Sequence, residues 1–351
     1  MIPAVVYLLP LTIPLTVLAG AAKGGWFTFE TLFWVFVALP VADRLVGLRR
    51  RNPTAAQARD LARSWRYRLV TWSWLPVHVA LVAWALGLVA ARDPTAVEWL
   101  GLTLSLGVTC GTVGITVAHE LMHRPGRVDR ALAEGLMMLT SYSHFCIEHV
   151  HGHHRRVATP GDPATARAGE SLYRFWPRTV FGGIASAWAL ERARLGRRGR
   201  PLFSADNRML RYGAELALLY LVIGASYGPA GVVLFAGQSL VAITTLEVVN
   251  YLEHYGLVRG RASDGRFEPV GPRHAWDSSH LISNLYLFNL GRHSDHHLRA
   301  GRPYHLLRHD GRAPQLPWGY GTMFLIALVP PLWRRIMDPR VAAWRRGAPN
   351  K

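Results

Sequence analysis

The chain has 351 residues, half of them from the set AVILMFWYC, and its 18% of charged residues is below the roughly 25% usual in soluble domains. Lys and Arg number 40 against 22 Asp and Glu, which gives a formal net charge of +18. This composition excludes an intrinsically disordered chain, and two cysteines, Cys110 and Cys146, are too few for a disulfide scaffold or a thiolate metal site.

Six apolar stretches are candidates for membrane-spanning helices, because a helix needs about 20 mostly apolar residues to cross a bilayer. In chain order they are residues 2–22, 27–46, 69–91, 97–118, 212–227 and 230–249. The first lacks a basic start and a clear cleavage site, so we expect a retained span and not a signal peptide. A last apolar stretch, 320–333, is short and broken by prolines, which favours an interfacial helix. The expected fold class is an all-α membrane protein with six transmembrane helices.

Arginine is distributed unevenly between these stretches. Eight arginines lie between Arg44 and Arg68, whereas the other short connections carry few or no positive charges. The positive-inside rule then places both termini and residues 124–211 in the cytoplasm. We therefore predict one integral membrane domain, residues 1–351, whose cytoplasmic cap is formed by residues 119–211 and 250–351. The charge is expected to hold this topology, to contact anionic lipid or to dock an acidic redox partner, and no nucleic-acid-binding module is expected.

Most of the 16 histidines lie in four short clusters, all on the predicted cytoplasmic side. The clusters are HELMH at 119–123, EHVHGHH at 148–154, NYLEHYG at 250–256 and RHSDHH at 292–297. The first places two imidazoles on one helical face, and it also fits the zinc-metalloprotease pattern. If the second is helical, His149 and His153 share a face and His154 is turned towards a second centre.

Nine clustered histidines, not counting His151, are costly at one membrane face unless something compensates them, and metal coordination is such a compensation. Neutral imidazole suits iron, zinc, copper or nickel, and nine ligands exceed one tetrahedral site, so two metals are expected. Nearby acids could orient the ligands by accepting the second imidazole N–H. These acids are Glu120, Glu148, Glu253 and Asp295. The alternative for them is salt bridging with Arg124, Arg155, Arg156 and Arg292.

The other histidines are expected to have structural or hydrogen-bonding roles and not to bind metal. His78, inside the third span, is expected to be structural. His144 and His151 are expected to be structural or hydrogen-bonding residues, with a supporting position behind the metal ligands as the alternative. Four more are expected to form cytoplasmic hydrogen bonds: His274, His280, His305 and His309.

The motifs resemble the signatures of the membrane alkane monooxygenase family, within the wider histidine-rich membrane desaturase and hydroxylase group. They are HELMHR at 119–124, EHVHGHH at 148–154, NYLEHYGL at 250–257 and LGRHSDHH at 290–297. Segments 155–171, 264–288 and 317–339 also resemble family segments, so the resemblance extends over residues 100–340. Gly291 is a departure, since the family often has Gln at this position.

The resemblance implies a non-haem diiron enzyme that inserts one oxygen atom of O2 into the terminal C–H bond of an alkane. It implies nine iron ligands: His119, His123, His149, His153, His154, His254, His293, His296 and His297. Electrons would come from NAD(P)H through a rubredoxin reductase and a rubredoxin. The sequence has no CxxC pair, so the rubredoxin is expected to be a separate protein. The implied location is the bacterial inner membrane.

The substrate is expected to be an apolar alkyl chain held between the spans. Bulky residues facing the substrate could limit the chain length that fits. The candidates are Trp34, Phe36, Trp72, Trp74 and Trp84. The alternative is that these residues face lipid or belong to an aromatic belt at the membrane interface. Rival activities of the same group are hydroxylation or desaturation of alkyl-aromatic methyl groups, terpenes or fatty acyl chains. A metal transporter and a zinc protease are more distant alternatives, because the ligands gather at one face and a protease would leave six histidines without a role.

Overall fold

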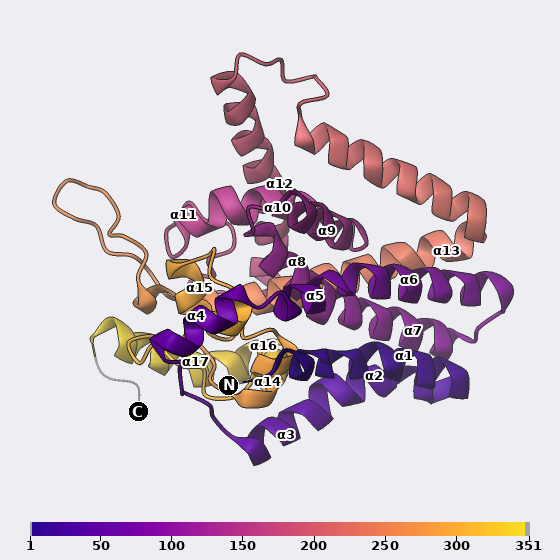
Figure 1. The fold of residues 1–351 in the computed structure, drawn as a ribbon, viewed down its shortest axis with the longest axis horizontal. Helices are drawn as coiled ribbons and strands as arrows, with labels where there is room; N and C mark the ends of the chain where they lie inside the picture. The colour runs from indigo at the N-terminus through magenta and orange to yellow at the C-terminus, as the bar shows by residue number, and fades with distance from the viewer. Residues whose placement is uncertain (1, 348–351) are drawn as a thin grey trace.

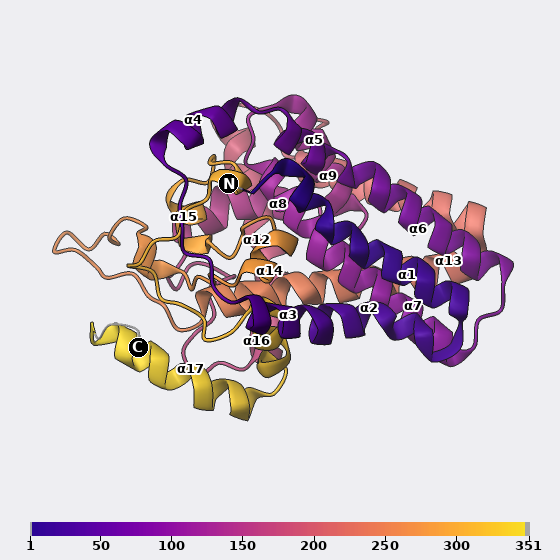
Figure 2. The same ribbon diagram turned by 60° about the horizontal axis from the view of Figure 1, so that its bottom comes forward.

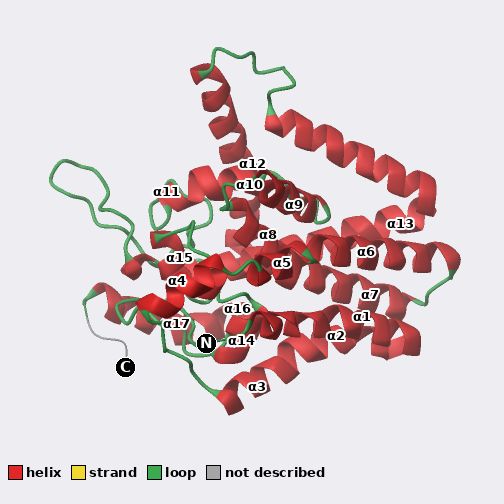
Figure 3. Ribbon diagram, viewed as in Figure 1, coloured by secondary structure: helices red, strands yellow, loops and turns green. Residues whose placement is uncertain are grey.

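The computed structural model describes residues 2–347 and consists of helices joined by loops (Figure 3). Residues 2–347 contain no β-strand element, and isolated bridges such as Leu48–His280 join loop segments. The predicted all-α class is confirmed for this part of the chain. The predicted cap ends with residues 348–351, which lie outside the described residues.

The helices are numbered in chain order. The α-helices are α1 Thr12–Lys23, α2 Glu30–Phe33, α3 Leu39–Val46, α4 Ala55–Arg63, α5 Arg66–Trp72, α6 Trp74–Ala91, α7 Ala96–Thr109, α8 Ile115–Met122, α9 Arg127–Met138, α10 Phe145–Glu148, α11 His154–Arg156, α12 Leu172–Arg197, α13 Arg208–His254, α14 Leu281–Tyr286, α15 His293–Leu298, α16 Tyr320–Ala327 and α17 Pro330–Arg345. The 3-10 segments are η1 Ala4–Leu11, η2 Gly25–Phe29, η6 Pro272–His274 and η7 Tyr304–Leu306. The π-helical segments are η3 Trp34–Ala38, η4 Cys110–Gly114 and η5 His149–His153.

Five helical stretches within residues 2–347 are long and apolar enough to cross a membrane, as expected of a multi-pass membrane protein. They are Ala4–Lys23, Gly25–Val46, Arg66–Ala91, Ala96–Met122 and Arg208–His254. The first four overlap the first four predicted spans. The predicted fifth and sixth spans both lie within α13, so the count of six separate helices is not obtained.

The 47-residue helix α13 is interrupted at Gly228, whose φ of 66° and ψ of −169° are not helical. Glycine adopts positive φ without a steric penalty, and the following Pro229 has no N–H to continue the helical hydrogen bonds. The chain turns sharply there, and the two arms of α13 diverge from the bend (Figure 1). The predicted boundary between the fifth and sixth spans therefore corresponds to a bend within one helix.

The second arm of α13 packs against α6 and α7, and α7 packs against α1 (Figure 1). Glycines on α7 and η4 allow α13 to come close. A Cβ on Gly107 would lie 2.4 Å from Cβ of Val241, and one on Gly111 would lie 2.7 Å from Cβ of Thr245. Small residues at such contacts let helix backbones approach closely in membrane bundles.

The histidine-bearing elements meet at one end of this bundle. Helices α8 and α15 lie there in both views, beside the end of α13 (Figure 2). Helix α12 packs against both α13 and α10, the helix that leads into η5. The four sequence clusters are thereby brought from distant parts of the chain to one place.

The predicted interfacial helix 320–333 is divided into two helices. Helix α16 ends at Ala327, and α17 begins at Pro330. Proline is favoured in the first turn of a helix but cannot continue one, so the Pro330–Pro331 pair starts a new helix. The prediction of a single helix here was wrong.

Candidate metal centre

Nine histidines form two neighbouring groups. In the five-histidine group, one ring nitrogen from each residue lies within 4.8 Å of all the others: His119, His123, His149, His154 and His296. The four-histidine group meets the same limit: His153, His254, His293 and His297. These are the nine residues proposed from the sequence as ligands, and the fold brings all of them together.

Helix α8 supplies the first pair of the five-histidine group. His119 lies in its last turn and His123 directly caps its end, so both rings project from one face. Their ring centroids are 5.3 Å apart. This i, i+4 arrangement follows from 3.6 residues per turn and was predicted from the sequence.

The second cluster divides differently from the expectation. Residues His149–His153 form a π-helix, in which hydrogen bonds join residues five apart. His149 and His154 therefore share a face, with their Nε2 atoms 3.0 Å apart, and both belong to the five-histidine group. His153 belongs to the four-histidine group. The expectation that His149 and His153 share a face, with His154 turned towards a second centre, was wrong because it assumed α-helical periodicity.

The four-histidine group joins the end of α13 to α15. His254 is the last residue of α13, and its Nε2 lies 3.2 Å from Nε2 of His293. His297 follows one turn after His293, with the Nε2 atoms 3.0 Å apart. His296 projects from another face of α15, and its Nε2 lies 3.0 Å from that of His154. Helix α15 thus supplies histidines to both groups.

Asp277 anchors the short helix α15. Its carboxylate accepts hydrogen bonds from the backbone N–H and the hydroxyl of Ser294, at 2.7 and 2.9 Å. Asp277 is buried, and this burial raises the pKa of its carboxyl to about 8. No motif in the sequence identified this residue, because it lies 16 residues before the histidines that it positions.

The protonation and hydrogen bonding of the histidines suit a cation. Burial holds the pKa of His149, His154 and His296 well below its usual value, so these rings are neutral and present lone pairs. Among the described residues, buried Nε2 of His123 and His153 has no hydrogen-bond partner. Desolvated lone pairs that converge without donors are stabilised by a bound metal, and imidazole suits divalent transition metals. The donor set therefore fits metal coordination.

The four predicted supporting acids have different contacts. Glu120 and Glu148 pair with Arg124 and Arg156, as the salt-bridge alternative proposed. Asp295 pairs with an arginine that was not expected, Arg302, and accepts from the backbone N–H of Arg308. In this structure these three acids do not accept an imidazole N–H.

Glu253 is the only one of those four acids whose described contacts include a histidine of the two groups. One of its carboxylate oxygens lies 3.2 Å from Nε2 of His293, and the other accepts a hydrogen bond from Tyr320 at 2.7 Å. Nε2 is the atom that faces His254 and His297. Glu253 therefore approaches the interior of the four-histidine group and not the outer nitrogen that was expected.

Asp162 makes the contact that was expected of the other acids, and the sequence reading missed it. Its Oδ2 lies 2.9 Å from Nδ1 of His153, and both side chains are buried. Burial by itself would lower the pKa of His153, but the Asp162 carboxylate raises it above the ordinary value. The pair fixes Nδ1 as the protonated nitrogen and leaves Nε2 free to coordinate. The only signal in the sequence was an acid nine residues after the histidine, and residues nine apart do not lie on the same face of a helix.

The remaining histidines lie outside both groups. His78 is buried and its Nδ1 faces the carbonyl of Trp74, as expected of a structural residue. The ring of His144 packs on Tyr142, and His151 is partly exposed. The four histidines predicted to form hydrogen bonds do so, with partners Glu268, Ser278, Leu61 and Ser279 for His274, His280, His305 and His309 respectively.

An apolar cavity of about 60 Å³ lies on the bundle side of the histidines. Its lining includes Thr116, Val249 and Leu290, each within five residues of a group histidine on the same stretch of chain. The cavity is thus lined by stretches of chain that also carry histidines of both groups. Its volume is well below the roughly 300 Å³ of a small ligand pocket, so as it stands it is a candidate position for one part of an apolar substrate.

Of the five predicted channel residues, only Phe36 lines this cavity in the described part of the chain. The indole N–H of Trp72 donates to Asp129 at 2.8 Å. Trp74 is completely buried in the core, Trp34 packs at its edge, and Trp84 is 37% exposed. For Trp72 the partner lies 57 residues further along the chain, a contact that the sequence does not show.

Comparison with known proteins agrees with this site. The family model described as fatty acid desaturase matches residues 93–327, which include all nine histidines. Alkane 1-monooxygenase 1 of Pseudomonas aeruginosa is 41% identical over 334 residues, covering 93% of this chain and 86% of that protein. Alkane 1-monooxygenase of Acinetobacter baylyi is 39% identical over 87% of this chain and 74% of its own length.

The chain belongs to the fatty acid desaturase family and, within it, to the oxidoreductases related to alkane 1-monooxygenases. A further relative is the hydroxylase component of xylene/toluene monooxygenase from Pseudomonas putida. It is 30% identical over 74% of this chain and 68% of its own length. The similarity to this aromatic hydroxylase is lower and shorter than that to the alkane enzymes.

Proposed function

We propose that this protein is an alkane 1-monooxygenase that hydroxylates the terminal carbon of alkanes at a non-haem diiron centre. The observation that carries the proposal is the pair of adjoining histidine groups beside an apolar cavity. The 38–41% identity to several alkane 1-monooxygenases supports the choice of substrate class. The overall change is conversion of an alkane, O2, two electrons and two protons into a 1-alkanol and water.

The five-histidine group would hold one iron and the four-histidine group the other. Bound iron would supply the O2-dependent oxidation of an unactivated C–H bond. The protein positions the ligands: Asp162 sets the tautomer of His153, and Asp277 holds α15 so that it reaches both groups. Seven of the nine histidines are buried, which limits the access of water to the site and would protect a strong oxidant from side reactions.

The apolar cavity, of about 60 Å³, would hold one part of the alkyl chain. Phe36 and Phe324, with ring centroids 4.8 Å apart, form part of its lining, and two threonines of the η4–α8 stretch lie nearer the histidines. Such a wall offers no charged group that could anchor a polar substrate end. It therefore favours a simple hydrocarbon over a fatty acyl chain with a polar head.

Electrons would come from NAD(P)H through a rubredoxin reductase and a separate rubredoxin, since the chain has no CxxC pair of its own. We further propose a bacterial inner-membrane location, with six spans, both termini and the histidine groups on the cytoplasmic side. The arginines between Arg44 and Arg68 support this orientation. The chain would then form one integral membrane domain, with the cap on the side of its electron donor.

A second candidate function is hydroxylation of an alkyl-aromatic methyl group, favoured by the 30% identity to the xylene/toluene monooxygenase component. Metal analysis of the purified protein, with octane and toluene each supplied under O2 with a reducing system, distinguishes the two. About two irons per chain and 1-octanol as the main product support the proposal. Two irons with benzyl alcohol alone would support the second function, and one zinc ion would contradict both.

Two histidines of the same segment give a matched test of the ligand assignment. His153 belongs to the four-histidine group, whereas His151, two residues away, lies outside both groups. We expect His153→Ala to lose iron and octanol formation, and His151→Ala to retain both. Equal iron content in the two variants would contradict the assignment.

A further inference from the structure

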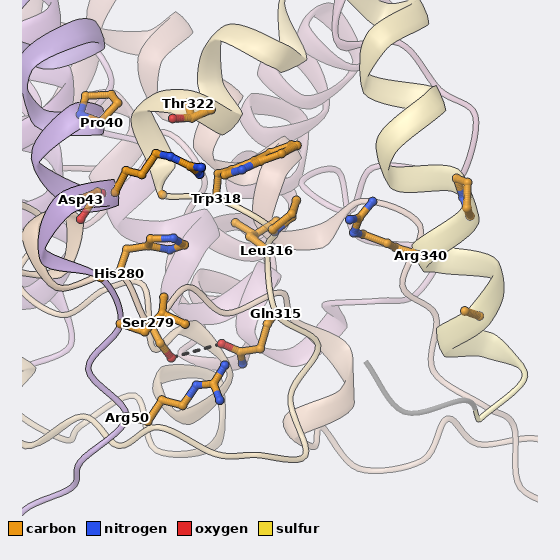
Figure 4. A pocket seen from close by; sticks show the side chains of 17 residues that line it. Pro40, Asp43, Arg50, Ser279, His280, Gln315, Leu316, Trp318, Thr322 and Arg340 are labelled. Carbon is orange, nitrogen blue, oxygen red and sulfur yellow. Dashed lines mark hydrogen bonds between the residues drawn. The ribbon is translucent and has the colours of Figure 1, made fainter. Parts of the chain in front are cut away.

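A cleft of about 1060 Å³ lies between the end of α3 and helix α17, away from the histidine groups (Figure 4). Its residues come from four segments of the chain: residues 40–50 with Arg44 and Arg50, residues 279–280, residues 315–322 and residues 339–343 with Arg340 on α17. Arg50 and Arg340 reach towards the cleft from opposite sides, and Trp318 stands on its wall (Figure 4). The proposed oxidation makes no use of this cleft.

The cleft carries positive charge that the protein does not neutralise. Among the described residues, Arg44, Arg50 and Arg340 form no salt bridge, and Arg340 donates only to the backbone carbonyl of Ile336. The one carboxylate in the lining, Asp43, accepts hydrogen bonds from Ser283. Three guanidinium groups at one cleft are suited to a phosphate, to which they donate forked hydrogen bonds.

The cleft lies at the end of a candidate membrane span, which points to a lipid as its ligand. The candidate span Gly25–Val46 ends at the cleft, where the next residue, Gly47, is part of the lining. Exposed apolar side chains continue away from it, with Val41 on α3 54% exposed and Leu325 on α16 42% exposed. Arginine and tryptophan above exposed apolar surface are typical of the level of lipid head groups.

The walls of the cleft are held by hydrogen bonds between segments far apart in sequence. The backbone N–H of Arg49 donates to the carbonyl of Ser279 at 2.8 Å, and that of Leu281 donates to the carbonyl of Gly47 at 3.1 Å. The hydroxyl of Ser279 donates to Gln315 at 3.2 Å (Figure 4). The cleft is therefore formed before a ligand arrives, which reduces the ordering cost of binding.

We propose that this cleft binds the phosphate of an anionic phospholipid, whose acyl chains lie along the exposed apolar residues of α3 and α16. The proposal requires the chain to lie in a membrane, but it does not depend on the proposed oxidation. The lipid would bridge α3 and α17, two helices that come from opposite ends of the chain.

The test compares how tightly purified full-length proteins bind lipid in a neutral detergent. The triple variant Arg44→Gln, Arg50→Gln, Arg340→Gln is set against a charge-matched control with Arg192, Arg197 and Arg198 changed to Gln. These control arginines are exposed on α12 or just after it. After delipidation, each protein is titrated with phosphatidylglycerol or phosphatidylcholine of the same acyl chains, and bound lipid is counted by native mass spectrometry.

We expect the parent and the control to retain phosphatidylglycerol, and the cleft variant to bind it at least about tenfold more weakly, since each basic residue near anionic lipid contributes about 1 kcal/mol. Phosphatidylcholine binding should be the same in all three. A triple Lys variant of the cleft arginines keeps the charge but not the forked hydrogen bonds, so it should recover part of the affinity, which excludes simple misfolding. Equal weakening in the control would overturn the proposal.

Two further probes distinguish other ligands. If glycerol 3-phosphate competes for the cleft as well as the lipid does, the acyl chains do not contribute to binding. That result would overturn the lipid proposal and indicate a site for a free phosphate. Binding of polyglutamate that is lost in the cleft variant, with phosphatidylglycerol binding unchanged, would identify a surface for an acidic protein and overturn the lipid proposal.

Discussion

Replacing Asp162 with Asn tests whether the buried carboxylate prepares His153 to hold a metal. The carboxylate lies 2.9 Å from Nδ1 of His153, and the two side chains are 0% and 1% exposed. Asn has the same shape but no charge, so it cannot stabilise the tautomer as strongly. Loss of such a partner typically lowers metal affinity 10–100-fold, which corresponds to about 1.4–2.8 kcal/mol.

The assay is an equilibrium competition for iron between the detergent-purified protein and a soluble chelator. Asp162 also accepts hydrogen bonds from Thr165 at 2.6 Å and from the backbone N–H of Ala164 at 3.2 Å, so the variant also loosens the loop. Thr165→Val serves as the control, because it removes the hydrogen bond to Asp162, together with one that Thr165 accepts from the backbone N–H of Ala158, and keeps the carboxylate on His153. We expect its iron affinity to change by less than about threefold.

Two results would refute this reasoning. If Asp162→Asn holds iron as tightly as the parent protein, the carboxylate does not support a ligand. If Thr165→Val weakens iron binding as much as Asp162→Asn, the loop and not the contact with His153 is responsible.

Three other substitutions follow from the same site. Gly291→Ala should destabilise the fold by about 1–3 kcal/mol, because a Cβ there would lie 2.8 Å from a backbone oxygen; the free energy of unfolding in denaturant measures this. Burial raises the pKa of Asp277 to about 8, so its carboxyl stays protonated in the fold while the unfolded chain ionises from about pH 4. As the pH rises from about 4 to about 8, this group therefore destabilises the fold increasingly. The melting temperature of Asp277→Asn should fall less over this pH range than that of the parent protein. Phe36→Ala enlarges the apolar cavity and should shift product formation towards longer alkanes in a competition among chain lengths.

Two of these have a matched control. An Ala at Gly311, where a Cβ meets nothing within 4 Å, should leave the stability nearly unchanged. Trp84→Ala should not alter the product length, because Trp84 does not line the cavity in the described chain. An unchanged chain-length preference in Phe36→Ala would show that this cavity does not hold the substrate.

The first four predicted spans and the histidine clusters could be found in the sequence because their signals are local. Apolar length alone identifies a stretch such as 69–91 as a span, and the i, i+4 spacing of His119 and His123 fixes a shared helical face. The family relation was also visible, since the motifs are short and contiguous. The bend at Gly228 was read as a boundary between two helices because a Gly-Pro pair interrupts the apolar pattern in either case.

The amino-acid sequence by itself determined the class of protein and the nine histidines that gather at one end of the bundle. Only the tertiary structure decided how they divide, because the π-helix at 149–153 pairs His149 with His154 and sends His153 to the other group. It also decided that Asp162 and Asp277 support the site. A side chain's partner is set by which segments pack together, and that depends on the whole chain and not on any spacing within one motif.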